Sequence, residues 1–290
     1  MTNTSDPVNN TSNHLCHLYN PYIPIMAEIQ AIEPLTARES LFKIILPEPL
    51  NHRPGQFVMA GLPGIGECAI SISSGPQSGT LLEMVIRKAG NVTGVLHQLK
   101  ESDYISIRGP FGSGFYLEDF RRKDIVIIAG GLGLVPLRSL ITPIMEHKSD
   151  YGMVHLIIGS RTPREALFRQ QIQQWKNQAD VHIIELVDDT DFQDWDGDIG
   201  LVTEPVRQLS IDEKNTLLVL CGPPVMYKFV LLEFKLYFNI PDDQIFIDLE
   251  RRMRCGLGKC GHCQINHVYC CKEGPVFRYS QLKDLPEALS

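Results

Sequence analysis

The cysteines near the end of the chain constrain its structure more than any other feature. Cys255, Cys260 and Cys263 are separated by four and then two residues, and Cys270 and Cys271 follow after a longer gap. This is the plant-type spacing for a [2Fe–2S] cluster held by four thiolates. Glycines between the cysteines can adopt positive φ, which lets the loop curl around a cluster and brings backbone N–H groups close to the sulfurs. The sequence therefore predicts an iron–sulfur loop whose fourth ligand is Cys270 or Cys271.

A zinc site of four cysteines is the main alternative, because zinc also binds closely spaced cysteine pairs. The plant-type spacing favours the cluster. Positive charge would lie beside this anionic centre, from Arg251, Arg252, Arg254 and Lys259. Disulfides are not expected, since nothing upstream resembles a secretory signal. A one-electron centre does little alone, so we expect the rest of the chain to hold its redox partner.

The composition narrows the class of protein. A chain of 290 residues can form two domains and a small appended module. Its formal net charge of −7 argues against nucleic-acid binding, and no apolar segment reaches the length of a membrane span. Residues 1–19 are expected to form a disordered tail, and nothing near His14, Cys16 and His17 completes a metal site. We therefore expect a cytoplasmic protein.

Residues 20–117 alternate short apolar segments with Gly and Pro turns. Short strands at this spacing predict a small antiparallel barrel or sandwich. One helical stretch, 92–100, interrupts them, and Thr93 is its expected N-cap. The expected strands are 40–46, 56–61, 69–73, 81–87 and 104–109.

Residues 118–243 have a different pattern, in which buried apolar strands alternate with helices. This order predicts a doubly wound α/β domain with a parallel sheet and right-handed crossovers. A second boundary near residues 242–244 precedes the cysteine-rich module, 244–290. The expected strands are 124–129, 154–159, 181–187 and 216–221, and the expected helices are 134–145, 165–178 and 225–238.

Two turns in this region have the composition of ligand-binding turns. Gly130-Gly131-Leu132-Gly133-Leu134-Val135-Pro136 joins a buried strand to a helix, where glycine backbone can meet a pyrophosphate. Pro136 stands where the usual Gly-x-Gly-x-x-Gly fingerprint has its last glycine, so a tight turn without a ligand is the alternative. Cys221-Gly222-Pro223-Pro224-Val225-Met226 follows another strand, at the sheet edge where open α/β sheets bind ligands, although it could merely start a helix.

Together these turns resemble the nicotinamide domain of the ferredoxin–NADP reductase superfamily. The resemblance implies an upstream FAD-binding barrel, which the strand-rich segment supplies. In the family's Arg-x-Tyr-Ser flavin motif the equivalent is Cys68-Ala69-Ile70-Ser71, followed by Ile72-Ser73. Ser71 would reach toward the isoalloxazine and Ile70 would replace the stacking tyrosine, while Arg87 or Lys88 would supply the charge of the missing arginine. Gly90-Asn91-Val92-Thr93 matches the second motif, a glycine turn facing the flavin pyrophosphate.

The C-terminal module narrows the resemblance. Leu249-Glu250-Arg251-Arg252-Met253-Arg254-Cys255 and Cys271-Lys272-Glu273-Gly274-Pro275-Val276-Phe277 resemble the gamma (diaphorase) subunit of cytoplasmic NiFe hydrogenases, as does Asn20-Pro21-Tyr22. The corresponding subunit of anaerobic sulfite reductase and the electron-transfer subunit of dihydroorotate dehydrogenase are similar. The resemblance implies Cys271 as the fourth ligand, because two residues separate the ligand from Gly-Pro in these relatives.

The resemblance implies an antiparallel β-barrel FAD domain, an α/β NAD(P) domain and a small [2Fe–2S] module. NAD(P)H would transfer a hydride to FAD, and electrons would pass singly through the cluster to a partner redox subunit, or in reverse. Ser71 and Cys221 are the implied catalytic residues. The implied cofactor-binding residues are Ala69, Ile70, Ser71, Ile72, Ser73, Arg87, Gly90, Val92, Thr93, Gly130, Gly131, Gly133, Pro136, Ser160, Arg161, Cys221, Gly222, Pro223 and Met226, and the implied cluster ligands are Cys255, Cys260, Cys263 and Cys271.

Three other functions remain open at this point. The chain could be the electron-transfer subunit of a dihydroorotate dehydrogenase or sulfite reductase, a redox sensor or adaptor without turnover, or a flavin reductase stapled by zinc. The nucleotide is also open between NAD and NADP. Ser160, Arg161 and Arg164 follow the second strand of the nucleotide domain, where an arginine can accept a 2′-phosphate, and this favours NADP.

Overall fold

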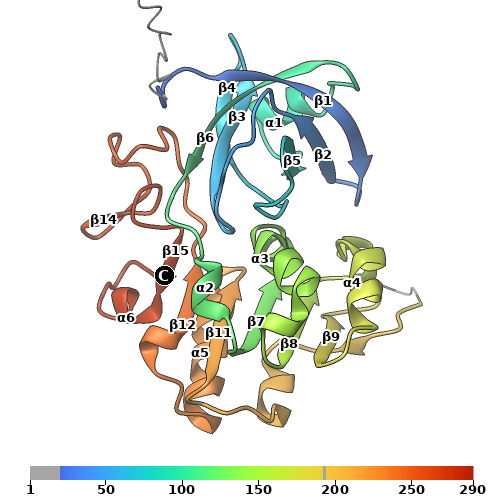
Figure 1. Cartoon of the computed structure of the whole chain (residues 1–290), viewed down its shortest axis with the longest axis vertical. Coiled ribbons are helices and arrows are strands. Elements are labelled where there is room, and N and C mark those ends of the chain that lie inside the picture. Colours follow the sequence, from blue (N-terminus) through green and yellow to red (C-terminus); the bar gives the residue numbers. More distant parts are fainter. Residues whose placement is uncertain (1–19, 192–193, 290) are drawn as a thin grey trace, which may run out of the picture.

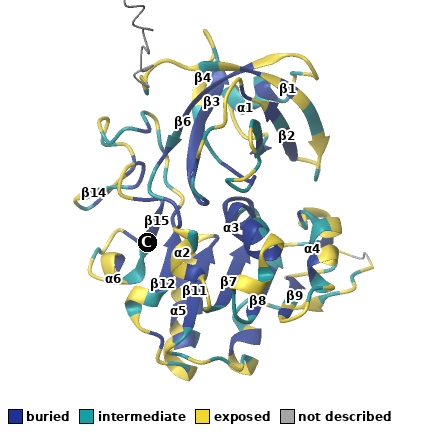
Figure 2. Cartoon of the chain, viewed as in Figure 1, coloured by how far each residue is buried: buried dark blue, intermediate teal, exposed yellow. Residues whose placement is uncertain are grey.

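The computed structural model describes residues 20–191 and 194–289, which form two sheets and a C-terminal module (Figure 1). The expected tail, 1–19, lies outside the described residues, as do His14, Cys16 and His17. Buried residues, dark blue in Figure 2, are concentrated in the strands of both sheets. None of the described helices combines the length and hydrophobicity of a membrane span.

The first sheet is antiparallel, as predicted, with strand order β4-β3-β6-β1-β2-β5. A bridge joins Ile72, just after β4, to Met84 on β5, so the two edges of the sheet approach each other as in a barrel. Its interior is filled by fully buried side chains such as Phe42 and Ile107. The strands are β1 (Ile25–Pro34), β2 (Glu39–Ile45), β3 (Phe57–Leu62), β4 (Gly66–Ser71), β5 (Leu81–Arg87) and β6 (Tyr104–Phe111).

The second sheet has the order β10-β9-β8-β7-β11-β12-β15 and is parallel except for β15, which confirms the predicted α/β class. Helices cover both faces of this sheet. Successive residues of a strand point to opposite faces, so each central strand contributes to the cores on both sides. On β7, Ile125 and Ile127 pack in the core that contains α3 and α4, whereas Val126 and Ile128 pack in the core that contains α5. The strands are β7 (Asp124–Gly130), β8 (Val154–Ser160), β9 (Val181–Val187), β10 (Asp198–Ile199), β11 (Thr216–Cys221), β12 (Ile245–Asp248) and β15 (Val276–Arg278).

The helices differ most from the expected bounds at α1, which ends at Leu96 rather than at residue 100, and at α4. Helix α1 has Gly90 at its N-cap, and Thr93 is the third helical residue, whose Oγ1 accepts hydrogen bonds from the N–H groups of Ala89 and Gly90. The predicted N-cap was therefore wrong. The stretch expected as one helix over 165–178 is split, because Phe168 has a φ of +56° just before α4. The helices are α1 (Asn91–Leu96), α2 (Leu117–Phe120), α3 (Leu134–Glu146), α4 (Arg169–Lys176), α5 (Pro224–Tyr237) and α6 (Tyr279–Leu282).

The cysteine-rich segment leaves the second sheet and returns to it. It follows β12, forms the short hairpin of β13 (Gln264–Ile265) and β14 (Val268–Tyr269), and re-enters the sheet as β15 beside β12. Strands β11 and β15, which lie on either side of the expected boundary near residues 242–244, thus belong to one sheet. This connection holds the cysteine loop next to β6 of the first sheet (Figure 1).

Arg138 of α3 fixes the two sheets relative to each other. Its Nη1 donates to the carbonyl oxygen of Ser73 at 3.1 Å and to a carboxylate oxygen of Glu83 at 2.7 Å. The neighbouring Ser139 Oγ accepts a hydrogen bond from the N–H of Gly55 at 2.9 Å. Because all these groups are largely buried, the bonds are shielded from water and hold the nucleotide domain against the barrel.

Candidate functional site

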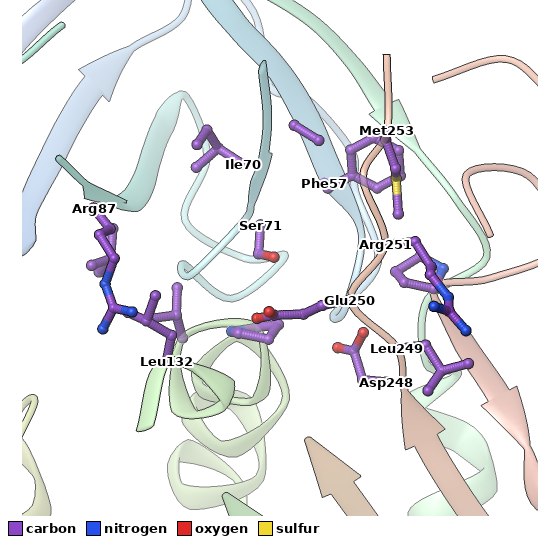
Figure 3. Close-up of a pocket in the computed structure, with 15 residues that line it drawn as sticks. Phe57, Ile70, Ser71, Arg87, Leu132, Asp248, Leu249, Glu250, Arg251 and Met253 are labelled. Carbon is purple, nitrogen blue, oxygen red and sulfur yellow. The ribbon is translucent and has the colours of Figure 1, made fainter. Parts of the chain in front are cut away.

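A pocket of about 250 Å³ lies where the barrel, the nucleotide domain and the C-terminal segment meet (Figure 3). Its walls are apolar except for a few side chains, chiefly Ser71, Arg87, Asp248 and Glu250, which is the usual composition of a cofactor site. The lining residues are Phe57, Ala69, Ile70, Ser71, Val85, Arg87, Leu132, Val135, Pro136, Asp248, Leu249, Glu250, Arg251, Met253 and Pro275.

The structure brings only part of the expected flavin motif to this pocket. Ala69, Ile70 and Ser71 at the end of β4 line it, and Arg87 at the end of β5 lines it from the facing edge (Figure 3). Ile72 is fully buried in the barrel core, and the carbonyl oxygen of Ser73 accepts a hydrogen bond from Arg138. The chain turns into the protein interior where β4 ends, so Ile72 and Ser73 lie behind the pocket lining rather than in it.

The second expected flavin motif lies at the start of α1, outside the pocket lining. Thr93 uses its hydroxyl to hold the turn, since Oγ1 accepts from Ala89 and Gly90 and donates to the carbonyl oxygen of Gly90 at 3.3 Å. A Cβ on Gly66, the first residue of β4, would lie 3.5 Å from Val92, which shows that α1 begins beside the start of that strand. The motif thus forms a rigid turn next to the expected flavin site.

The glycines of the dinucleotide turn have different roles. A Cβ on Gly133 would lie 2.2 Å from the carbonyl oxygen of Cys221, and one on Gly130 would lie 2.7 Å from the sulfur of Met226. These two glycines let the turn pack directly against the Cys221-Gly222 turn. Gly131 has a φ of +55° and no atom within 4 Å of a Cβ position, so it faces open space. A nucleotide would approach the turn from that side.

The carboxyl ends of neighbouring parallel strands bring the other expected nucleotide residues to the same edge. Cys221 ends β11 and is fully buried, and burial raises the pKa of its thiol well above the ordinary range. The N–H of Gly222 donates to the hydroxyl of Tyr227 at 3.1 Å, and that hydroxyl donates to the carbonyl oxygen of Asp248 at 2.7 Å. Ser160, which is buried, ends β8 at this edge, and the exposed Arg161 follows it. Pro223 is exposed at the start of α5.

Asp248 and Glu250 are pocket residues for which the sequence analysis expected no role. Asp248 ends β12, only 3% of it is exposed, and its Oδ2 has no hydrogen-bond partner. Burial, reinforced by the nearby Glu250 carboxylate, raises the pKa of Asp248 to about 8. Glu250 is open to solvent at the mouth of the pocket, yet the pocket walls desolvate its carboxyl group and raise its pKa as well. The position of Asp248 at the end of a buried strand is the only sequence signal that marks it.

The unpartnered Oδ2 of Asp248 indicates which kind of ligand the pocket fits. A buried carboxyl group without a partner is costly, and a bound ring or amide with N–H groups would satisfy it. Flavin and nicotinamide both carry such groups next to a flat apolar surface, and the mixed lining of the pocket fits them. The residues present are therefore compatible with a flavin and a nicotinamide at this place.

We expect the stability of the protein to fall as the pH rises from about 4 to about 8 because of Asp248. In the folded protein its raised pKa keeps the proton bound, whereas the unfolded chain releases it near the ordinary value of 3.8. One such proton changes the free energy of unfolding by about 1.4 kcal/mol per pH unit. The Asp248→Asn variant should show a clearly flatter dependence in urea unfolding over this range. Equal slopes for the two proteins would contradict the assignment.

The cysteine loop presents backbone N–H groups to sulfur. Cys255 Sγ lies 3.4 Å from the nitrogens of Leu257 and Lys259, and Cys271 Sγ lies 3.1 Å from the nitrogen of Gly258. Burial alone would raise the pKa of Cys255, but these donors and Cys260 outweigh it and lower the pKa to about 6. Gly256, Gly258 and Gly261 all have positive φ, near +70°, as the tight loop requires. A loop that stabilises thiolates in this way fits an iron–sulfur cluster.

Cys260 lies within reach of Cys255, and the Sγ of Cys263 lies 3.4 Å from the nitrogen of Cys271. Over residues 20–191 and 194–289, no three His, Cys, Asp or Glu side chains group together as ligands of one metal ion. Cys270 points elsewhere: it is fully buried and its Sγ donates to the carbonyl oxygen of Leu249.

Comparisons with known proteins place this geometry in context. Residues 127–231 match the oxidoreductase NAD-binding domain, and residues 250–283 match the iron–sulfur cluster binding domain of dihydroorotate dehydrogenase B. The sulfhydrogenase 1 subunit gamma of Pyrococcus furiosus is 36% identical over 280 residues, which are 93% of this chain and 96% of the relative. A probable dihydroorotate dehydrogenase B (NAD(+)) electron transfer subunit of Methanocaldococcus jannaschii is 32% identical over 267 residues, or 91% of this chain and 93% of the relative.

Solved structures share the fold. An NADH-dependent reduced ferredoxin–NADP oxidoreductase, described for flavin-based electron bifurcation, superposes with a TM-score of 0.71 at 24% identity, covering 91% of this chain and 92% of that one. A ferredoxin NADP+ reductase of Neisseria gonorrhoeae, solved with bound FAD and NADP, has a TM-score of 0.64 at 20% identity over 77% of this chain and 97% of that one.

Proposed function

We propose that this chain uses FAD and a [2Fe–2S] cluster to pass electrons between NAD(P)H and a partner redox subunit. It belongs to the ferredoxin–NADP reductase-like family of electron-transfer subunits, which includes the sulfhydrogenase gamma subunits and the dihydroorotate dehydrogenase B electron transfer subunits. One observation carries this proposal. The segment from Asp248 to Met253 lines the pocket shared by the barrel and the nucleotide domain, and the cysteine loop begins two residues later at Cys255. A flavin in that pocket would thus lie between the nucleotide turn and the cluster.

The residues have separate roles in this proposal. When bound, FAD exchanges electrons in pairs with a nicotinamide and singly with an iron–sulfur cluster. Ala69, Ile70 and Ser71 would hold the ring of the flavin, with Arg87 at the opposite edge of the pocket. The rigid turn before α1, Gly90 to Thr93, would face its phosphates.

On the nucleotide side, the open face of Gly131 would admit the pyrophosphate, and Pro136 would shape the pocket wall. Cys221 would border the nicotinamide as a neutral thiol, since its pKa is raised. Asp248 would hold a proton and accept or donate a hydrogen bond to whichever ring occupies the pocket.

Cys255, Cys260, Cys263 and Cys271 would hold the cluster. The plant-type spacing of these cysteines and the backbone N–H groups directed at their sulfurs favour a [2Fe–2S] cluster over a single zinc ion. The cysteine loop borders an open groove of about 840 Å³ whose lining includes Tyr22, Ile65, Arg254 and Cys255. A partner subunit seated there would contact a cluster ligand directly, which makes this groove the proposed exit for electrons.

The partner is proposed to be a NiFe hydrogenase subunit, because the sulfhydrogenase 1 relative covers nearly the whole chain at 36% identity. The second candidate is a dihydroorotate dehydrogenase, which the matched cluster domain and the 32% identical relative support. The complex isolated through a tag on this chain should reduce NAD(P)+ with hydrogen in the first case and with dihydroorotate in the second. The free chain should reduce viologen dyes with NAD(P)H; a complete lack of this activity in the flavin-loaded chain would favour a redox sensor.

Arg161 is proposed to favour NADPH over NADH. It is exposed at the carboxyl end of β8, where a guanidinium can bind a 2′-phosphate. The Arg161→Ala variant should raise the KM for NADPH at least tenfold, the equivalent of about 1.4 kcal/mol, with little change for NADH. Steady-state dye reduction with each nucleotide measures this, and an equal loss for both would remove the idea.

A further inference from the structure

Arg108 of β6 connects four segments of the chain although the sequence analysis assigned it no role. Only 8% of it is exposed. Its Nε and Nη2 donate to the two carboxylate oxygens of Glu67 at 2.9 and 2.5 Å, which is a bidentate pair. Glu67 lies on β4, two residues before Ala69, so this pair is attached directly to the strand that lines the pocket.

The same guanidinium group reaches the cysteine loop. Its Nη2 donates to the carbonyl oxygen of Cys255 at 3.2 Å, and its Nη1 donates to the carbonyl oxygen of Pro21 at 2.6 Å. The ring of Phe111 contacts both Arg108 and the cysteine loop. The guanidinium carbon of Arg108 is 5.4 Å from the ring centroid, and a Cβ on Gly256 would be 2.8 Å from the ring. Arg108 therefore fixes the first cysteine of the loop to the barrel.

We propose that Arg108 and Glu67 form a positioning pair that holds the loop of Cys255 against the flavin strand and sets the reduction potential of the cluster. This inference rests on the proposed function, since it requires a cluster at these cysteines. The reduced cluster carries one more negative charge than the oxidised cluster. A buried positive charge beside Cys255 therefore favours reduction, and a negative charge disfavours it, with little screening by salt. In the intact pair the carboxylate of Glu67 partly offsets the charge of Arg108.

The two residues then have opposite effects on the cluster. Arg108→Gln removes the positive charge and keeps the Glu67 carboxylate, so it should lower the reduced-to-oxidised ratio at a fixed potential about tenfold, which is about 59 mV for one electron. Glu67→Gln removes the carboxylate that offsets Arg108 and should shift the potential upward, by less, because a third of the Glu67 side chain is exposed. The double variant should return toward the wild-type potential.

The test is a redox titration of the whole, cofactor-loaded chain, with the reduced cluster followed by low-temperature EPR. Arg138→Gln is the matched control, because Arg138 also forms a largely buried ion pair with a barrel glutamate, Glu83. The hydrogen bonds of Arg138 go to Ser73, Glu83 and Gln171, all of which lie outside the cysteine loop. The cluster potential of this control should match that of the wild type.

Shifts of opposite sign for the two single variants would support the inference, because a loop that is merely displaced has no reason to respond with opposite signs. Shifts of the same sign, or unchanged potentials with a normal EPR signal, would overturn the inference and leave the proposed function standing. The absence of any cluster signal in the wild-type chain would overturn both. Glu67→Gln keeps the test decisive if Arg108→Gln fails to fold.

Discussion

Gly133→Ala is expected to abolish nucleotide-dependent electron transfer almost completely. The φ of Gly133 is −58°, which any residue can adopt, so the effect comes from space alone. The new methyl group would lie 2.2 Å from the carbonyl oxygen of Cys221 and 2.8 Å from the nitrogen of Gly222, and neither backbone atom can move without separating the two turns. We expect a loss of about 3 kcal/mol in the free energy of unfolding and about a hundredfold slower dye reduction by NAD(P)H.

Gly131→Ala is the matched control, two residues away in the same turn. Its methyl group would meet no atom within 4 Å, so only the positive φ opposes the change, at a cost of about 1 kcal/mol. Urea unfolding measures the packing cost of the two variants side by side, whereas flavin reduction is compared between Gly133→Ala and the wild type, because Gly131 itself faces the proposed nucleotide. Similar losses of unfolding free energy for the two alanines would contradict the packing role of Gly133.

Cys271→Ala is expected to remove the iron–sulfur cluster, whereas Cys270→Ala should retain it. Cys271 Sγ accepts the N–H of Gly258 and interacts with Cys263, which places it among the other thiols. Cys270 instead donates to Leu249 from a fully buried position, so its loss should cost about 1 kcal/mol of stability and leave the cluster intact. Iron analysis and absorbance beyond the flavin bands distinguish the two.

The reverse result, with iron lost from the Cys270 variant and kept by the Cys271 variant, would show that the fourth ligand had been assigned to the wrong cysteine. Loss from both variants with normal folding would point to a rearranged loop. In the flavin-loaded Cys271→Ala protein, NAD(P)H should still bleach the flavin, because the nucleotide turn contributes to the pocket wall and the cluster ligands do not.

The strands could be predicted from sequence where burial alone decides which residues are apolar. The strands at 81–87, 181–187 and 216–221 were predicted to the residue, because each is mostly apolar and directly follows a polar residue. Thr93 was misplaced because a threonine that bonds back to the N-cap backbone looks in sequence like the N-cap itself. The helix expected over 165–178 could not show in sequence that Phe168 adopts a left-handed conformation.

Of the expected cofactor-binding residues, the pocket lining contains one run of neighbours and two single residues, Arg87 and Pro136. Ala69, Ile70 and Ser71 line the pocket as a unit, but the chain turns inward directly afterwards and takes Ile72 and Ser73 into the interior. Asp248 and Arg108 were missed for a different reason. Each is a single polar residue on a strand whose surroundings come from distant segments: the walls of the pocket bury Asp248, and the hydrogen-bond partners of Arg108 lie 41 to 147 positions away.

An anaerobic titration of the purified chain with NADH and then NADPH, followed by absorbance and low-temperature EPR, would show whether electrons pass from the nucleotide through the flavin to the cluster. We expect the flavin absorbance to bleach and a signal from one reduced [2Fe–2S] cluster per chain to appear, with the preferred nucleotide acting at lower concentration. No bleaching with either nucleotide would contradict this electron path and leave the turn from Gly130 to Pro136 as a structural element only.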